Sequence, residues 1–362
     1  MRIIVLGAGR VGSLVALELS KLYDVSVADK SEKSLEPLKQ VASVLNVDLS
    51  RQDNILEAVK RFDIVVNALP GSLGYNVLQA CIKMRKDLVD ISFMPEDPIL
   101  LREAVEKAGV TIVVDAGFAP GFSNMVVGRI QSELGDLDNV EVNVGGLPKE
   151  PKPPLYHAVL FSLTDLIDEY LRPARIVKDG ALVSIDPLSV IERVRILGFD
   201  LERFPTDGLR TMLHTIRAKN MVEYTLRWPG HLMRMKVLKE LGFFDSKHLG
   251  RTLEIIAPHM TYEVADMSIM EVLGETGGEV IRYVLYDEAS EGHTSMARVT
   301  GFTAVEVTKL LVKGSIPSGL VPPELLGVDR RVFESIVDGL RSKGIKIERL
   351  LKRESSSHIG LC

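Results

Sequence analysis

The sequence predicts an α/β protein: a doubly wound parallel sheet with an inserted α+β domain whose sheet is mostly antiparallel. Three observations support this fold class. Short apolar runs alternate with amphipathic stretches over residues 1–121, a glycine-rich turn follows the first apolar run, and the pattern changes to alternating strands after Pro120-Gly121. Alternation of strands with helices is typical of a parallel sheet that helices cover on both faces.

The expected elements fall into three parts of the chain. In the first domain, residues 1–121, we expect strands over 3–6, 25–28, 64–68, 88–91 and 111–115 and a helix over 11–22. In the second domain, residues 122–294, we expect strands over 140–145, 156–161, 221–228, 268–274 and 279–287 and helices over 163–171, 230–241 and 249–259. Residues 295–362 carry helical patterns at 298–312 and 332–340 without a sheet of their own, so we expect them to return to the first domain.

A glycine-rich turn links the first expected strand to the first expected helix. It reads Gly7-Ala8-Gly9-Arg10-Val11-Gly12, with no gap on either side. In such a turn Gly7 makes the tight bend, Gly9 lets the backbone approach a pyrophosphate, and Gly12 lets the helix lie close to the strand. Free N–H groups at the helix start attract the anion. The turn therefore predicts a Rossmann dinucleotide-binding site that uses all six residues.

A carboxylate follows the second expected strand. Asp29 ends this run close to the expected distance of about 20 residues from the glycines. A carboxylate there accepts hydrogen bonds from both ribose hydroxyls and repels a 2′-phosphate. Asp29 therefore favours NAD over NADP, although Lys30 could soften the repulsion. In the alternative interpretation, Asp29 only starts a turn before Ser31.

Small or polar residues follow the other expected strands of the first domain. Ligands of doubly wound sheets bind at the carboxyl ends of the strands, so five such corners in register predict a ring around the cofactor. Any one corner alone could be an ordinary turn. Besides Asp29, the residues that we expect to bind the cofactor are Asp48, Ala68, Leu69, Pro70, Asp90, Ser92, Asp115 and Gly117.

Composition argues against several function classes. The formal charge of −5 comes from 44 basic and 49 acidic residues that are interspersed, so no basic stripe predicts a nucleic-acid or anionic-lipid partner. The sequence has no apolar window of about 18 residues that would predict a membrane span. Only two cysteines, Cys81 and Cys362, are present, which fits a reducing compartment and a cytoplasmic protein. No HxxxH or CxxC spacing occurs, so we expect no metal site.

Three longer motifs add to the glycine turn and carry a resemblance. They are Asp115-Ala116-Gly117-Phe118-Ala119-Pro120-Gly121, Gly145-Gly146-Leu147-Pro148 and Arg227-Trp228-Pro229-Gly230-His231. With them the chain resembles the saccharopine dehydrogenase superfamily over nearly its whole length, and its lysine 6-dehydrogenase branch in particular. Segments 90–96 and 295–302 resemble archaeal members of that branch. The resemblance implies a Rossmann domain interrupted by an α/β substrate domain, NAD as cofactor, oxidation of an amino-acid amine, and a homodimer joined through the second sheet.

Two positions depart from the saccharopine-handling relatives. Ala119 stands where they carry an aspartate, and Val144 stands where they often carry a cysteine. Loss of a carboxylate and a thiol makes this pocket less polar. The departures therefore favour a smaller substrate that lacks the glutamate half of saccharopine.

Oxidation of an amine requires a base, because the ammonium of free lysine titrates near 10.4 and only the neutral nitrogen can release a hydride from carbon. His231 is our candidate, since Pro229 marks a helix start and His231 falls in its first turn. The positive helix end keeps an imidazole neutral there. In the alternative interpretation, His231 only fixes the helix start.

Several residues are candidates for binding the substrate. Arg227 and Arg172 could bind its α-carboxylate, with Arg227 alternatively in a surface ion pair with Glu223. The remaining candidates are Tyr156 to position the amine, Asp168 and Glu169 to bind the α-ammonium, Phe118 to pack on the nicotinamide, and Gly146 of the GGLP motif. For most of these, solvation of a helix face or core packing is the competing explanation.

The function that the resemblance implies is NAD-dependent oxidative deamination of the ε-amine of L-lysine. The product would be allysine, which closes to 1-piperideine-6-carboxylate, with release of ammonia. Two alternatives stay open. One is a saccharopine- or carboxyspermidine-type dehydrogenase that forms a carbon–nitrogen bond reductively. The other is an NAD-responsive regulator without turnover.

Overall fold

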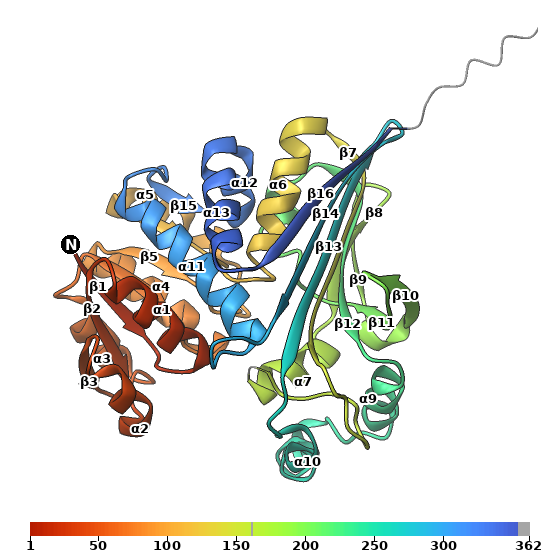
Figure 1. The fold of residues 1–362 in the computed structure, drawn as a ribbon, viewed down its shortest axis with the longest axis horizontal. Helices are drawn as coiled ribbons and strands as arrows, with labels where there is room; N and C mark the ends of the chain where they lie inside the picture. Colours follow the sequence, from red (N-terminus) through yellow and green to blue (C-terminus); the bar gives the residue numbers. More distant parts are fainter. Residues whose placement is uncertain (161, 354–362) are drawn as a thin grey trace, which may run out of the picture.

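The computed structural model of the protein describes residues 1–160 and 162–353. Its first sheet has seven strands in the order β15-β6-β5-β4-β1-β2-β3, and all its ladders are parallel (Figure 1). This is the doubly wound order, and the chain reverses direction across the sheet between β1 and β4. The strands are β1 (Arg2–Leu6), β2 (Asp24–Asp29), β3 (Ser43–Asn46), β4 (Ile64–Asn67), β5 (Asp87–Asp90), β6 (Thr111–Val113) and β15 (Gly319–Val321).

The strand β1 shows why the apolar runs become central strands. Ile3 and Val5 pack into the core on one face of the sheet, while Ile4 and Leu6 pack into the core on the other. A strand buried on both faces is apolar without alternation. Helices α3, α4 and α5 cover the face of Ile4, and α1 and α11 cover the face of Ile3. The helices and short 3₁₀ turns of this part are α1 (Arg10–Ser20), α2 (Glu32–Leu35), η1 (Glu36–Leu38), α3 (Gln52–Val59), α4 (Gly71–Met84), η2 (Pro98–Leu101), α5 (Arg102–Ala108) and α11 (Ser295–Val312).

The second sheet runs in the order β10-β11-β12-β7-β13-β14-β16, with β8 and β9 attached beside β12. The β12–β7 ladder is parallel and the other ladders of this sheet are antiparallel, which confirms the predicted mostly antiparallel sheet. Its strands are β7 (Leu137–Pro148), β8 (Ala174–Lys178), β9 (Ala181–Ile185), β10 (Glu192–Ile196), β11 (Phe199–Pro205), β12 (Ala218–Arg227), β13 (Asp266–Thr276), β14 (Glu279–Glu288) and β16 (Lys346–Arg353).

One continuous apolar core joins the two sheets. Helices α6, α11 and α13 lie between them (Figure 1), and the same cluster of buried side chains includes Ile3 of β1, Val142 of β7 and Phe333 of α13. A separate cluster holds α7, α9 and α10 together at one end of the second sheet. The helices and the 3₁₀ turn of this part are α6 (Phe122–Leu134), α7 (Leu163–Leu171), η3 (Pro187–Ser189), α8 (Met212–Thr215), α9 (His231–Glu240), α10 (Ser246–Met260), α12 (Pro323–Val328) and α13 (Arg330–Ser342).

One predicted strand is wrong. Residues 156–160 form no strand, and Phe161 lies outside the described residues. Tyr156 has a φ of +57° and its N–H donates to Lys152 O at 2.8 Å, so the segment after the prolines turns instead of extending. Leu155 then packs among α7, α9 and α10.

The last part of the chain returns to the first domain and also adds a strand to each sheet. Helix α11 packs on α1, and β15 pairs with β6. The strand β16, which the pattern does not predict, pairs with β14. The serine tail with Cys362 lies outside the described residues. Within residues 1–160 and 162–353, no helix combines the length and apolarity needed to cross a membrane.

Candidate functional site

A cavity of about 740 Å³ opens at the carboxyl ends of β1, β2 and β4 and is closed on its other side by β7, β12 and α7. Cavities of roughly 300–1,000 Å³ hold cofactors and small ligands. The cavity lies at the crossover point of the doubly wound sheet, which is where such sheets bind ligands. It therefore joins a dinucleotide-binding edge to side chains of the second domain.

The glycine turn has the geometry that a pyrophosphate requires. Gly7 has a φ of +99°, and a Cβ there would lie 2.8 Å from Ala68 O. A Cβ on Gly12 would lie 2.0 Å from Gly7 O, so only glycine allows α1 to lie this close. At Gly9 a Cβ would meet nothing within 4 Å, and Gly9 lines the cavity as the N-cap of α1 without a side-chain cap. The open backbone and the free N–H groups of the helix start fit a dinucleotide phosphate.

Asp29 lies at the end of β2 on the cavity wall. Its Oδ2 accepts from Ala8 N at 2.7 Å, and its Oδ1 accepts from Ser31 N at 2.7 Å. The carboxylate is thus held in a fixed orientation by the glycine turn and by the start of α2. Lys30 and Asp48 line the same end of the cavity.

Most of the predicted cofactor and substrate residues line the cavity. Ala8, Asp90, Asp115, Asp168, His231 and Tyr156 do not. The predicted residues that line it are Gly7, Gly9, Arg10, Val11, Gly12, Asp29, Asp48, Ala68, Leu69, Pro70, Ser92, Gly117, Phe118, Gly146, Glu169, Arg172 and Arg227.

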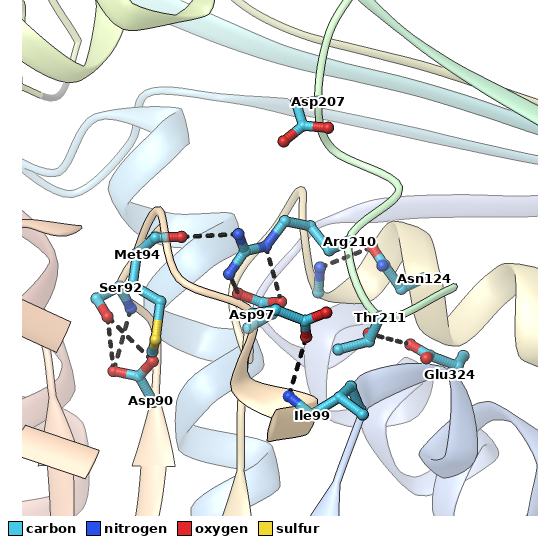
Figure 2. Close-up of polar contacts among 12 residues, drawn as sticks. Asp90, Ser92, Met94, Asp97, Ile99, Asn124, Asp207, Arg210, Thr211 and Glu324 are labelled. Atoms are coloured by element: carbon cyan, nitrogen blue, oxygen red, sulfur yellow. Dashed lines mark hydrogen bonds and ion pairs between the residues drawn. The ribbon is translucent and has the colours of Figure 1, made fainter. Parts of the chain in front are cut away.

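The predicted contacts of Asp90 and Asp115 with the cofactor need correction, because both carboxylates are buried behind the cavity wall. Asp90 accepts from Asn67 Nδ2 at 2.6 Å. It also accepts from Ser92 Oγ at 2.9 Å (Figure 2), and burial raises its pKa to about 7. Asp115 pairs with the buried Arg210 at 3.2 Å. Both therefore support the wall of the cavity from inside, a role that depends on tertiary partners.

The strand β12 presents alternate side chains to the cavity. Glu223, Thr225 and Arg227 all line it, as the period of two in a strand requires. Arg227 is only 2% exposed, and its Nη2 donates to Glu169 Oε2 at 2.5 Å. The alternative of a surface ion pair between Arg227 and Glu223 is therefore wrong.

His231 does not line the cavity, so its position argues against the predicted role as base. It begins α9 as predicted, but it is fully buried, and its Nδ1 bonds to Leu155 O at 2.6 Å. Its Nε2 bonds to Tyr170 Oη at 2.8 Å, and Tyr170 Oη in turn accepts from Arg227 Nε at 3.1 Å. Burial, followed by the charge of Arg227, lowers the pKa of His231 to about 3. His231 is thus a neutral support for the tyrosine that contacts Arg227.

Of the two predicted substrate residues Tyr156 and Arg172, only Arg172 lines the cavity. Tyr156 lies under the guanidinium of Arg234, away from the cavity. Arg172 lines the cavity, stacks 4.7 Å from the ring of Phe93 and pairs with Asp168. Its buried Nη1 has no hydrogen-bond partner within the part of the chain that the structure describes.

Four carboxylates line the substrate end of the cavity, and the sequence interpretation identified only one of them as a binding group. Burial raises the pKa of Glu223 to about 8, and the nearby charges of Glu169 and Asp207 add to this. The signal that could have identified Glu223 is the period of two along the predicted strand 221–228, which puts Glu223 on the same face of the strand as Arg227. The four are Asp165, Glu169, Asp207 and Glu223.

This arrangement combines a dinucleotide cradle with a pocket suited to a cation. The carboxylates favour a positively charged substrate, and the unpartnered Arg172 nitrogen offers a place for a carboxylate. Within residues 1–160 and 162–353, no group of three or more histidine, cysteine, aspartate or glutamate side chains is placed to hold a metal ion.

Two adjacent parts of the chain match models of the same protein family. A family model described as the saccharopine dehydrogenase NADP binding domain matches residues 3–113, and one described as the saccharopine dehydrogenase C-terminal domain matches residues 117–345. The structure resembles that of the L-Glu-forming saccharopine dehydrogenase from Saccharomyces cerevisiae, with a TM-score of 0.78 and 18% identity over 97% of this chain and 99% of that one. A homospermidine synthase from Legionella pneumophila in complex with NAD gives a TM-score of 0.69 with 13% identity over 99% of this chain and 93% of that one.

Relatives found by sequence match a smaller share of the two chains. An alpha-aminoadipic semialdehyde synthase from Arabidopsis thaliana is 27% identical over 68% of this chain, a stretch that spans only 27% of that protein. A carboxynorspermidine synthase from Vibrio alginolyticus is 26% identical over 40% of this chain and 44% of that protein. The matched stretch thus spans well under two thirds of either relative.

Proposed function

The chain belongs to the saccharopine dehydrogenase family, and from this premise we propose that it oxidises the ε-amine of L-lysine with NAD. The product would be allysine, which closes to 1-piperideine-6-carboxylate after loss of ammonia. The observation that carries the proposal is the set of four carboxylates around the substrate end of the cavity, directly beside the dinucleotide cradle.

The charges of the pocket support an amino-acid amine as substrate. Two of the carboxylates are neutralised, since Glu169 pairs with Arg227 and Asp207 accepts from Arg175 at 2.7 and 2.9 Å. Asp165 and Glu223 have no such ion pair within the described residues. Asp165 favours a cationic amine and the unpartnered Oε2 of Glu223 can accept a hydrogen bond from it, while Arg172 favours the α-carboxylate at the other end of the substrate.

The chain's own residues would hold the coenzyme at the glycine turn. Gly9 and the first N–H groups of α1 would receive the pyrophosphate, and Asp29 would receive the adenine-side ribose. When bound, the nicotinamide ring supplies a hydride acceptor. Asp29 supports NAD over NADP because a fixed carboxylate repels a 2′-phosphate.

A reductive carbon–nitrogen bond-forming activity is the second candidate, and the polyamine synthases among the similar proteins favour it. It differs from the first in direction and in needing both an aldehyde and an amine. An NAD-responsive regulator would bind the coenzyme but would neither oxidise lysine nor join an aldehyde to an amine.

One panel of assays separates these functions. Purified protein with NAD and each of a set of primary amines should form NADH with lysine, and mass spectrometry should identify the cyclic imine. Formation of a secondary amine from NADH, an aldehyde and an amine, without lysine oxidation, would instead identify the reductive function. Tight NAD binding with no turnover in either direction would identify the regulator.

We also propose a homodimer. The second sheet and its turns carry the exposed leucines Leu197, Leu350 and Leu351, which support an apolar contact through this sheet. Sedimentation equilibrium checks it, and a monomer at all concentrations contradicts it.

A further inference from the structure

We infer that Glu223 is the catalytic residue that takes the proton from the substrate ammonium, and that the loop 206–211 holds its carboxyl in place. The inference rests on the proposed amine oxidation and assigns its base. Neither role is visible in the glycine motif or in the longer sequence motifs.

The position of Glu223 suits a base. The residue is 4% exposed, yet it lines the cavity, and its Oε2 has no hydrogen-bond partner among the described residues. A buried polar atom normally has a partner, and an open cavity beside it offers a place for one from a ligand. An ammonium N–H is the donor that such an oxygen lacks.

Three of the other acid–base groups in or near the site are engaged elsewhere. Glu169 is paired with Arg227, and Asp207 accepts two hydrogen bonds from the Arg175 guanidinium. His231 has both ring nitrogens bonded to the protein and does not reach the cavity. Asp165, at the first turn of α7, remains as the rival carboxylate.

The carboxyl of Glu223 packs directly against the backbone at Gly208. A Cβ on Gly208 would lie 1.6 Å from Glu223 Oε1 and 2.0 Å from its Cδ, so the carboxyl lies directly against this stretch of backbone. Thr206 N donates to Glu223 O at 3.0 Å, and the Oγ1 atoms of Thr206 and Thr225 lie 2.8 Å apart. Thr206 thus joins the loop to the strand, two residues before the glycine that contacts the carboxyl.

The far side of the loop is fixed to the first domain. Arg210 donates to Met94 O at 2.7 Å and to Asp115, and Thr211 Oγ1 donates to Glu324 Oε2 at 2.9 Å (Figure 2). Arg210 is therefore a positioning residue, which acts on Glu223 through Gly208. It links the end of β6 in the coenzyme domain to the base in the substrate pocket.

The proton step balances without an oxidant. One N–H bond of the substrate ammonium breaks, an O–H bond forms on Glu223, and the nitrogen keeps the electron pair. The neutral amine then has the lone pair that expels a hydride from the adjacent carbon. Because burial raises the pKa of Glu223 to about 8, the acceptor form predominates only above that pH in the free protein.

The test compares E223Q, E223D and wild type in lysine oxidation between pH 6 and 10. In wild type, log kcat/KM should rise with pH to a bend near pH 8, the pKa of Glu223. E223Q should lose this bend and lower kcat by about 100–1,000-fold with a smaller change in KM. E223D, which keeps the acid one methylene shorter, should keep the bend at a lower rate.

Further variants separate a base from a structural group. G208A should displace the Glu223 carboxyl from its position without removing the acid. It should therefore lower kcat, as E223Q does. E271Q changes a similarly buried glutamate on β13 that does not line the cavity, and it should behave as wild type. NADH fluorescence titration should give unchanged coenzyme affinity in all variants.

A readout that does not depend on turnover is stability against pH. The folded-state pKa of Glu223 is raised, so the unfolded chain loses a proton between about pH 4.5 and 8 that the folded chain keeps, and stability falls across this window. In urea unfolding the fall should be smaller in E223Q than in wild type, because Asp90 and Glu324, whose pKa values burial also raises, keep their share of it. A fall of the same size in E223Q and wild type contradicts the buried protonated state of Glu223 and overturns the inference.

The outcomes for the two proposals differ. Wild type that oxidises no amine overturns the proposed function, and this inference with it. Active wild type with an E223Q variant that keeps the bend and the rate overturns the inference alone. Loss of the bend in D165N instead of E223Q assigns the base to Asp165 and has the same effect.

Discussion

At the scale of single residues, two buried titratable groups respond to pH in opposite senses. Burial keeps His231 neutral, with a pKa of about 3, and keeps Glu223 protonated up to a pKa of about 8. Both groups prefer the uncharged form because the surroundings solvate charge poorly. The difference in role comes from access, since Glu223 lines the cavity and His231 does not.

His231 should make the fold sensitive to acid. Its folded pKa of about 3 lies below the ordinary histidine value of 6.5, so as pH falls the unfolded chain gains a proton first and stability is lost between pH 6.5 and 3. At pH 5 the loss is about 2 kcal/mol. Between pH 7 and pH 5 the urea-unfolding free energy of H231Q should therefore gain about 2 kcal/mol relative to wild type, while that of H248Q, at an exposed site, should not. Turnover in H231Q should fall by less than about tenfold, since a general base contributes more than this.

Asp29 should set the coenzyme preference. D29N removes the charge and keeps an oxygen that can accept from Ala8 N or Ser31 N. We expect the affinity ratio of NADP to NAD to rise by about tenfold, equivalent to 1.4 kcal/mol. Fluorescence titration with both reduced coenzymes measures this, with D24N at the exposed start of β2 as the matched control. An unchanged ratio would show that Asp29 serves only the turn.

At the scale of elements, the β11–α8 connection decides how the domains meet. Arg210 and Asp115 are both buried, so loss of either partner leaves an uncompensated charge in the interior. R210M should lower the free energy of unfolding by about 3–5 kcal/mol. The double variant R210M/D115N should recover part of this loss. Additive losses in this double-mutant cycle would mean that the pair is not coupled.

The predictable elements are those whose own residues carry a strong pattern. The run 3–6 is apolar throughout because both of its faces are buried, and the glycine turn after it carries its own geometry. The strand β3 and the edge strands β8 and β9 are largely exposed or half-buried, so their sequences show no clear period. The wrong strand at 156–161 arose because apolar residues of a loop pack into a helical cluster.

The candidate site divides in the same way. Gly7, Gly9 and Gly12 could be assigned from spacing, because their roles depend on local backbone. His231 was correctly placed at a helix start, but its burial depends on Leu155 and Tyr170, which are distant in sequence. Glu223 depends on Gly208, 15 residues away, and on the alternation of β12, so its place in the pocket follows from tertiary structure.

At the scale of the whole molecule, the two sheets share one core. Side chains from β1, α1, β7, β13 and α13 belong to the same buried cluster, and β15 and β16 join the C-terminal segment to each sheet. Separate domains would have separate cores and could unfold independently. Here the loss of one sheet exposes apolar surface of the other.

The shared core predicts that coenzyme binding stabilises the second sheet as well as the first. The single tryptophan of the chain, Trp228, lies after β12, where its Nε1 donates to Pro148 O at 2.7 Å and its ring packs edge-on against Phe199. Its fluorescence therefore reports unfolding far from the glycine turn. NAD at 100 times its dissociation constant should raise the unfolding free energy by about 2.7 kcal/mol, and the urea midpoints by Trp228 fluorescence and by circular dichroism should rise together. A Trp228 midpoint that stays fixed while the circular dichroism midpoint moves would mean that the sheets unfold as independent units.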